Sequence, residues 1–374
     1  RVTDSAPDVP GKRLLMRGTG HSISDARPAH LADEVVRFFA AGTATQRAGS
    51  DGVVSWEPGR LDMFRTGTDG RAYHKFFAGG WGPGGITADW EPVGGPGRGV
   101  RLRDRLSVVS WEPGRLDVFG TGTDGRAYHK FFGGGWGPGG MTADWEAVGG
   151  PASGVGFVGA VTAVSWERGR LDVLGTGTDG RVHHNFFAGG WGPGGITADW
   201  EPVGGPGRGV AARDRLSVVA WEPGRLDIVG TGTDGRAYHK FFAGGWGPGG
   251  ITADWEPVGG PAGGSFAGAV DVTSWGPGRL DIVGTGTDGR VYHKFFGGGW
   301  GPGGITADWE PVGGPRGVAT REKLGVVAWE PGRLDIVGTG TDGRAYHKFF
   351  GGGWGPGGMT ADWEPVGGSA SGLR

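Results

Sequence analysis

The feature that most constrains this chain is a repeat of about 55 residues that occurs six times. Trp56 and the five tryptophans in equivalent positions follow one another at spacings of 55, 55, 55, 54 and 54 residues. The copies cover about 53–368 of the 374 residues and contain all 18 tryptophans of the chain, three per copy. Such a period indicates an array of supersecondary units that are buried by their neighbours.

Each copy has the pattern of four short strands. In the copy at 106–150, VVSW precedes the turn EPGR, LDVFGTG alternates up to TDGR, AYHKFF alternates into GGWGPGG, and WEAVGG ends at paired glycines. Asp-Gly is a strong signal for a tight hairpin turn. Four antiparallel strands in about 50 residues, with no competing helical period, predict an all-β fold of the β-propeller type.

The connectors between copies alternate in character. GRGVRLRDRL, GRGVAARDRL and RGVATREKL are charged, whereas PASGVGFVGAVTA and PAGGSFAGAVDVT are small and apolar. The resulting superperiod of about 110 residues indicates three duplicated pairs around a pseudo-threefold axis. We therefore predict six blades, with seven as the alternative, and two kinds of boundary between blades.

We divide the chain into a propeller at 51–370 and an N-terminal extension at 1–50. The propeller repeats lie at about 51–105, 106–160, 161–215, 216–269, 270–323 and 324–370. In the extension, HLADEVVRFFAAG has apolar residues at helical spacing and predicts one helix without a counterpart in the repeats.

Composition excludes several classes of protein. The 88 Gly and 24 Pro residues fit a disordered chain, but an aromatic content of 11% opposes disorder. A net charge of −2 and a pI near 6.5 argue against a nucleic-acid partner, and no apolar run predicts membrane insertion. The absence of cysteine excludes disulfides, thiolate metal sites and a cysteine nucleophile. We expect an extracellular protein, and the start at Arg1 without a visible signal peptide indicates a mature product or a fragment.

One tryptophan stands inside each GGWGPGG segment. Its glycine neighbours leave a flat apolar ring beside exposed backbone amides, a combination that suits a sugar with an apolar face and several hydroxyls. The alternative is that each ring folds over its own blade as a core residue. The predicted sugar-binding set of this kind is Trp81, Trp136, Trp191, Trp246, Trp300 and Trp354.

In a four-stranded meander the first and third loops lie at the same end of the blade. WEPGR therefore shares a face with Trp81, and a site there would recruit Glu57 or Arg60 of its own or the next blade; the connectors lie on the opposite face with TDGR. Because Gly276 replaces the glutamate, copy five should bind worst; copy three has Arg168 in place of the proline. The WEPGR members of the predicted site are Trp56, Trp111, Trp166, Trp221, Trp275 and Trp329, with Arg60, Arg115, Arg170, Arg225, Arg279 and Arg333.

A histidine recurs in the middle of each third strand. A ring of six around a channel would suit a metal, but a strand histidine that bonds to a neighbouring blade is the favoured interpretation, so we predict no metal or cofactor. The series is His74, His129, His184, His239, His293 and His347.

Acids also recur, as Asp62 in the second strand and Asp69 at the turn. Paired carboxylates are typical of glycoside hydrolysis. An acid repeated six times is a poor catalyst, because active sites need two differently tuned carboxyl groups. We therefore predict hydrogen bonds that lock turns and blades, and no catalytic residue.

The unit SWEPGRLDVFGTGTDGRAYHKFF, followed by W, DWE and a GG stop, resembles the repeat of the Photorhabdus-type bacterial β-propeller lectins over all six copies. The resemblance implies calcium-independent binding of fucose or O-methylated sugars in aromatic-lined pockets between blades. Members of that family usually have seven blades, and the GPGGITAD insertion here is longer than theirs. These departures leave the identity of the sugar open.

The N-terminal segment RLLMRGTGHSISDARPAHLADEVVRFFA resembles the last strand, catalytic-histidine loop and final helix of α/β-hydrolases. By that resemblance His21 would be the triad base, yet the chain has no G-x-S-x-G elbow before it. We interpret 1–45 as the tail of a larger hydrolase, with a diverged seventh blade as the alternative.

The leading hypothesis is a non-enzymatic lectin that binds glycans at several equivalent sites, which raises the effective concentration of each further contact. A substrate-targeting propeller of a larger secreted hydrolase or esterase is the first alternative. A protein-binding scaffold that uses the charged connector face is the second. The oligomeric state stays open.

Overall fold

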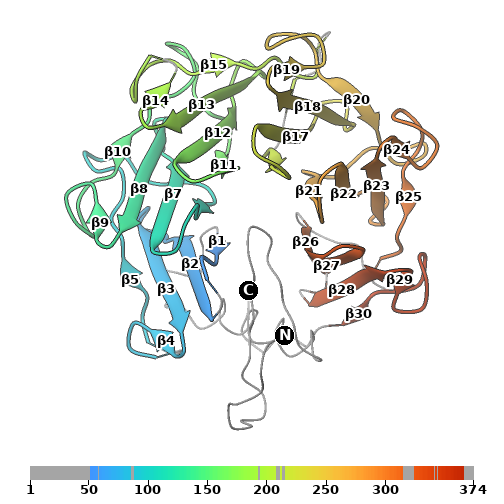
Figure 1. Cartoon of the computed structure of the whole chain (residues 1–374), viewed down its shortest axis with the longest axis horizontal. Helices are drawn as coiled ribbons and strands as arrows, with labels where there is room; N and C mark the ends of the chain where they lie inside the picture. The colour runs from blue at the N-terminus through green and yellow to red at the C-terminus, as the bar shows by residue number, and fades with distance from the viewer. Residues whose placement is uncertain are drawn as a thin grey trace.

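The computed structural model describes residues 51–57, 59–85, 88–192, 194–207, 211–212, 215–314, 324–340, 342 and 344–365. Within these ranges all regular structure is β, and the strands form six sheets around a common axis (Figure 1). The prediction of a six-bladed β-propeller is therefore confirmed. The expected N-terminal helix, His21 and the hydrolase-like segment lie outside the described residues. No helix long and apolar enough to span a membrane occurs among the residues described.

The three inner strands of each blade form an antiparallel meander. The innermost strands are β1 (Asp51–Val54), β6 (Ser107–Val109), β11 (Thr162–Val164), β16 (Ser217–Val219), β21 (Asp271–Thr273) and β26 (Gly325–Glu330). The second strands are β2 (Arg60–Thr66), β7 (Arg115–Thr121), β12 (Arg170–Thr176), β17 (Arg225–Thr231), β22 (Arg279–Thr285) and β27 (Arg333–Thr339). The third strands are β3 (Ala72–Ala78), β8 (Ala127–Gly133), β13 (Val182–Ala188), β18 (Ala237–Ala243), β23 (Val291–Gly297) and β28 (Ala345–Gly351).

The outermost strand of each blade is split into two pieces that both pair with the third strand. The first pieces are β4 (Trp81–Gly82), β9 (Trp136–Gly137), β14 (Trp191–Gly192), β19 (Trp246–Gly247), β24 (Trp300–Gly301) and β29 (Trp354–Gly355). The second pieces are β5 (Glu91–Pro92), β10 (Glu146–Ala147), β15 (Glu201–Pro202), β20 (Glu256–Gly259), β25 (Glu310–Pro311) and β30 (Glu364–Pro365).

This split corrects one prediction, because GGWGPGG is not wholly a loop. Trp81 pairs with Phe77, so the Trp-Gly dipeptide begins the fourth strand, and His74 pairs with Glu91 after the insertion. A glycine is required at position 82 because the backbone there lies close to the ring of Phe76. A Cβ atom on Gly82 would lie 2.4 Å from the ring of Phe76.

A buried lysine on the third strand anchors the loop between the two outer pieces. Lys130 is 0% exposed, and its Nζ donates to the carbonyl oxygens of Pro138, Gly140 and Ala143 at 3.2, 2.5 and 2.9 Å. Burial lowers the pKa of Lys130, while the charge of Asp144 acts against this. The ammonium group thus satisfies loop carbonyls that have no strand partner.

Blade three has Asn185 at this position, and we expect the replacement Asn185→Lys to stabilise the protein. Asn185 is 0% exposed, and its Nδ2 has no hydrogen-bond partner among the described residues. Because a buried unsatisfied donor costs about 1–3 kcal/mol, the free energy of unfolding should rise by about that amount. Urea unfolding measures the change, and the reciprocal variant Lys130→Asn should lower stability. Equal midpoints for Asn185→Lys and the parent would contradict this.

The hydrophobic core lies between consecutive blades. Val54 and Phe64 of the first blade pack in one cluster with Leu106, Leu116 and Val118 of the second. The innermost strands contact one another from β1 to β26 in chain order. In repeats two to six, the third tryptophan bonds to the blade before it. The observed pairs from indole Nε1 to carbonyl oxygen are Trp145 to Val93, Trp200 to Val148, Trp255 to Val203, Trp309 to Val258 and Trp363 to Val312, at 2.7–2.9 Å.

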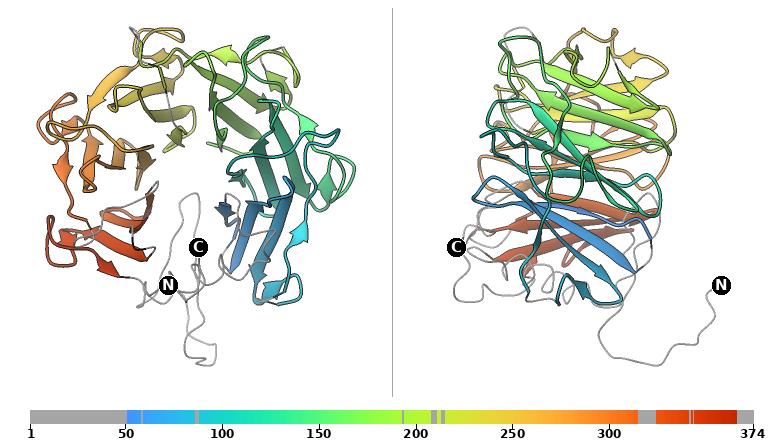
Figure 2. Two further views of the ribbon diagram at one scale, coloured as in Figure 1. Left: turned by 180° about the vertical axis from the view of Figure 1, so that it is seen from behind. Right: turned by 90° about the vertical axis from the view of Figure 1, so that its left-hand side faces the viewer.

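The two ends of the strands define two faces of the ring, which is seen edge-on at the right of Figure 2. Arg60 pairs with Ala78 at the end of β3, so the WEPGR loop and the turn before Trp81 lie on the same face of the ring. We call this face the loop face. Leu102 of the first connector donates its N–H to the carbonyl of Gly70 in the TDGR turn. The connectors therefore lie with the TDGR turns on the opposite face, here called the connector face. This is the face that the meander predicts for them.

Candidate functional site

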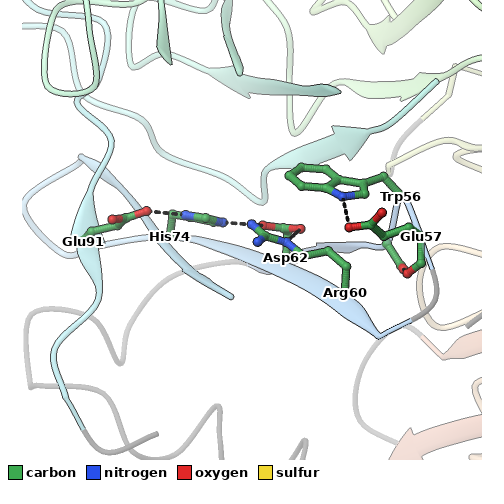
Figure 3. Close-up of polar contacts among 7 residues, drawn as sticks. Trp56, Glu57, Arg60, Asp62, His74 and Glu91 are labelled. Carbon is green, nitrogen blue, oxygen red and sulfur yellow. Dashed lines mark hydrogen bonds and ion pairs between the residues drawn. The ribbon is translucent and has the colours of Figure 1, made fainter. Parts of the chain in front are cut away.

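A line of four charged side chains crosses the first blade (Figure 3). In the first blade, Arg60 donates Nε and Nη2 to the two carboxylate oxygens of Asp62 at 2.6 and 2.5 Å. His74 contacts Asp62 Oδ1 through Nε2 at 2.8 Å and Glu91 Oε1 through Nδ1 at 2.5 Å. Arg60 and Asp62 lie two residues apart on one strand and so point to the same face, while strand pairing brings in His74 and Glu91.

The same network occurs in every blade. The copies are Arg115, Asp117, His129 and Glu146; Arg170, Asp172, His184 and Glu201; Arg225, Asp227, His239 and Glu256; Arg279, Asp281, His293 and Glu310; and Arg333, Asp335, His347 and Glu364. The prediction that the repeated aspartates lock the blades is confirmed. Asp69 closes its turn by accepting from the N–H of Arg71 and the hydroxyl of Tyr73.

The electrostatics of the network favour a protonated histidine. Burial acts to lower the pKa of His129, but hydrogen bonds to Asp117 and Glu146 and their negative charges outweigh it. The pKa of His129 is therefore raised above its ordinary value. In blade four, the hydrogen bonds from His239 and Arg225 outweigh the effect of burial and lower the pKa of Asp227.

This geometry corrects the expectations for the histidines. Each one bonds within its own blade rather than to a neighbouring blade, because its partners lie on the adjacent strands of the same sheet. Both ring nitrogens face carboxylates, so six separate ion networks replace the alternative of a ring of ligands around a channel. Among the described residues, no group of histidines and acids is suited to hold a metal.

We expect the protein to lose stability as the pH rises above neutrality. The pKa of each network histidine is raised in the folded state, so its stabilising contribution is complete below the unfolded value of about 6.5. That contribution is lost as the pH rises through the folded pKa. Melting temperatures between about pH 6 and pH 9 should therefore fall, more steeply than in a variant with His129→Gln. A melting temperature that rises over this range would contradict the assignment.

Aromatic rings from two blades meet at the loop-face end of this network. Trp56 lies nearly parallel to Phe132 of the next blade, with ring centroids 6.1 Å apart and an interplanar angle of 7°. The guanidinium of Arg60 lies 4.4 Å from the Trp56 centroid and 4.3 Å from that of Phe76. Arg60 is thus fixed between two rings and a carboxylate.

The GGWGPGG tryptophan completes the arrangement from the side of the next blade. Trp136 stands edge-on to His74 of the preceding blade, with centroids 5.6 Å apart and an angle of 73°, and edge-on to Phe132 at 5.5 Å. Its side chain is half-buried, so it belongs neither to the solvent alone nor to the core of its own blade. Across the blade boundary Trp136 thus contacts the preceding blade, through His74. The recruitment of Glu57 or Arg60 by a GGWGPGG tryptophan stays a prediction.

We call this set the inter-blade aromatic cluster, defined by Trp56 and Arg60 of one blade with Phe132 and Trp136 of the next. The further described clusters combine Trp111, Arg115, Phe187 and Trp191; Trp166, Arg170, Phe242 and Trp246; Trp221, Arg225, Phe296 and Trp300; and Trp275, Arg279, Phe350 and Trp354. Trp81 packs on Phe77 in the first blade. Arg333 pairs with Asp335, while the side chain of Trp329 lies outside the description.

The sequence interpretation missed Phe132 and its equivalents. Strand alternation placed the two phenylalanines of AYHKFF on opposite faces, but the pattern does not say which one meets the loop of the blade before. The signal that would have found it is the strand pairing of Phe132 with Trp136. This pairing makes the two residues neighbours across the third and fourth strands.

The clusters differ in the acid that follows the tryptophan of the WEPGR loop, here called the loop tryptophan. Glu57 and Glu167 are exposed and accept from the indole Nε1 of Trp56 and Trp166 at 3.1 and 3.2 Å. Glu112 is instead held across the blade boundary by Arg168, with Nε 2.6 Å from Oε2. In blade five Gly276 supplies no acid at all.

Comparison with solved structures reveals similar folds. A mutant of the Aleuria aurantia lectin in complex with Fucα1-6GlcNAc has 15% sequence identity and a TM-score of 0.52, and the match covers 88% of this chain and 99% of that one. The BP39L lectin of Burkholderia pseudomallei has 16% identity and a TM-score of 0.54 over 83% and 84% of the two chains. The SapL1 lectin in complex with α-methyl fucoside has 15% identity and a TM-score of 0.50 over 83% and 96%.

At these identities the likeness concerns the fold. No model of a protein family matches the chain, and no curated protein matches it either.

Proposed function

We propose that this protein is a multivalent lectin that binds glycans at the inter-blade aromatic clusters of the loop face. The observation that carries the proposal is the half-exposed pair of rings beside a fixed arginine, repeated at successive blade boundaries. Rings provide an apolar surface for the C–H face of a sugar, and a few fixed polar groups orient its hydroxyls. The fold supports the proposal, since two of the similar structures hold fucose-containing ligands.

The polar groups of the cluster favour a sugar with few hydroxyls to satisfy. Two of the guanidinium nitrogens of Arg60 are engaged by Asp62, and both ring nitrogens of His74 are engaged by acids. What the cluster offers is therefore mainly aromatic surface. This supports 6-deoxy sugars such as fucose, or O-methylated sugars, over highly hydroxylated ones. Such glycans are displayed on cell surfaces, so we propose that the protein acts outside the cell.

We propose no catalytic role for the network acids, because each is repeated in every blade with the same partners.

A glycan array tests the lectin function. Fucosylated and O-methylated glycans should be retained on the array by the purified protein, and added α-methyl fucoside should compete for the fucosylated ones. Retention of none of the arrayed glycans by a folded sample would overturn the proposal.

We expect the replacement Gly276→Glu to strengthen sugar binding at the cluster between blades five and six. It restores the acid that Glu57 and Glu167 provide in blades one and three. A hydrogen bond to a charged group contributes about 1.5–3 kcal/mol, so the affinity there should rise about tenfold or more. Titration with α-methyl fucoside, followed by the NMR signal of the Trp275 indole N–H, measures this one cluster. The Trp56 signal serves as the internal reference and should titrate as before; an unchanged midpoint for Trp275 would refute the role of the acid.

A further inference from the structure

We propose that the boundary between blades two and three carries a second kind of ligand site, on the connector face, that takes a single neutral sugar unit through hydrogen bonds alone. The structure has a cavity of about 390 Å³ there. Its walls are the TDGR turn of blade two, the connector at 149–156, and Thr197 and Asp199 from the loop of blade three. It lies at the other end of the strands from the inter-blade aromatic clusters and does not depend on them.

This connector differs from the one before it after Gly150, which still pairs with Asp199 of blade three. At the boundary of blades one and two, a Cβ on Gly97 would lie 2.1 Å from the carboxyl carbon of Asp144, so the backbone rests directly on that acid. Gly97 also has a φ of 73°, which a residue with a side chain rarely adopts. Ala152 occupies the equivalent place after Pro151, and its Cβ forbids the same approach to Asp199.

The alternation of connectors repeats this contrast. Gly207 approaches Asp254 as closely as Gly97 approaches Asp144, with a distance of 2.0 Å from the ideal Cβ to the carboxyl carbon. The apolar connector between blades four and five has Ala262 after its proline, as the one between blades two and three has Ala152. The connectors with Gly97 and Gly207 thus place a glycine against the side chain of the acid, whereas the two alanine-bearing connectors have a Cβ at that place.

The polar groups around the cavity suit hydroxyls. Asp124 forms part of the wall. Its carboxylate is held within its own blade, because it accepts from the N–H of Arg126 at 3.1 Å and from the hydroxyl of Tyr128 at 2.7 Å. Asp199 and the side chain of Arg126 are exposed, and the hydroxyls of Ser153 and Thr197 lie in the same lining. An acceptor, a donor and two hydroxyls around one space match the mixed donor and acceptor character of a sugar ring.

Size and charge narrow the ligand class. The volume lies near the lower end of the range of about 300–1,000 Å³ that small-molecule sites span, which fits one sugar unit. The lining has two carboxylates and one guanidinium, so a negatively charged ligand is disfavoured. The lining contains no aromatic residue, so recognition there does not use stacking. Ligand preference should therefore differ from that of the aromatic clusters.

NMR titration of the full chain with methyl α-mannoside, methyl α-galactoside and α-methyl fucoside tests the site. We expect at least one of these probes to shift the backbone amide signals of Ser153 and Thr197. The variants Arg126→Ala and Asp199→Asn should weaken that response about tenfold or more. The matched variants Arg71→Ala and Asp144→Asn, at the boundary of blades one and two, should leave it unchanged.

An exchange of connectors gives a second test that does not depend on single side chains. Replacement of residues 151–156, PASGVG, by the sequence PGRGVR of residues 96–101 should bring a glycine against Asp199 and abolish the response of the Thr197 amide. The proposal is overturned if none of the three probes shifts these amides, or if the exchanged connector leaves the titration unchanged. Tryptophan indole signals that respond while these amides stay still would overturn the second site and leave the lectin proposal standing. Amide signals of Ser153 and Thr197 that respond while the indole signals stay still would support the second site and overturn the lectin proposal.

Discussion

Replacement of Asp117 by Asn is expected to lower the free energy of unfolding by about 3–5 kcal/mol, the largest loss for a single change in this protein. Asp117 is 0% exposed and accepts from Arg115 twice and from His129 once. The amide removes the negative charge that both cations share and turns one acceptor into a donor. His129 is then buried with one acid where it had two.

Urea unfolding of the variant measures this loss, and Asp124→Asn is the matched control. Asp124 lies in the exposed turn of the same blade, and an asparagine there can still accept from the N–H of Arg126. The control should lose no more than about 1 kcal/mol. A double-mutant cycle of Asp117→Asn with His129→Gln should show strong coupling, because the two residues act in one network. Equal losses for Asp117→Asn and Asp124→Asn would show that the network contributes nothing beyond an ordinary turn.

The second large effect is on binding to a glycan-coated surface. A variant with one loop tryptophan left should bind such a surface about 10²–10⁴-fold more weakly, because linked sites act through effective concentration. The affinity of the remaining cluster for free α-methyl fucoside should not change. The variant keeps Trp56 and carries Trp111→Ala, Trp166→Ala, Trp221→Ala, Trp275→Ala and Trp329→Ala.

The replacements are made at the tryptophans of WEPGR because Trp56, Trp111, Trp166 and Trp275 are half-buried at strand ends. Trp136, in contrast, also packs against the buried His74. Truncation of Trp136 would loosen the boundary between blades as well as the site. Surface plasmon resonance on immobilised fucosylated glycan measures the effect, with the melting temperature as a check of the fold. The same five positions changed to Phe keep an aromatic face and should retain most of the surface binding. Full surface binding by a folded alanine variant would exclude the loop tryptophans from the sites.

Much of the fold could be predicted from sequence because its signals are local. Asp-Gly in TDGR specifies a tight turn, and alternation in AYHKFF specifies a strand, so the meander and its two faces follow directly. The number of blades follows from counting the repeats. The split of the outer strand was not predicted, because the GPGGITAD insertion hides the fact that Trp81 and Glu91 pair with the same strand.

The candidate site was predicted only in part, since it depends on contacts between distant residues. Alternation says which face of a strand His74 occupies, but not that Glu91, 17 residues further on, will lie beside it. The meeting of Trp56 with Phe132 depends on how one blade is rotated against the next. The tryptophans and arginines of WEPGR were assigned to the right end of the blade. Their partners across the boundary needed the structure.

The bond from Trp145 to Val93 and its repeats have a consequence for how molecules of this chain meet one another while they fold. Each blade is completed by a neighbour of nearly identical sequence, so the surface that receives blade two of one molecule also fits blade two of another. Repeat proteins are prone to such exchange between chains. Correct assembly therefore relies on the short connectors, which keep the proper neighbour at a far higher local concentration than any competitor from a second molecule. Dilution during refolding favours the monomeric ring over exchanged pairs.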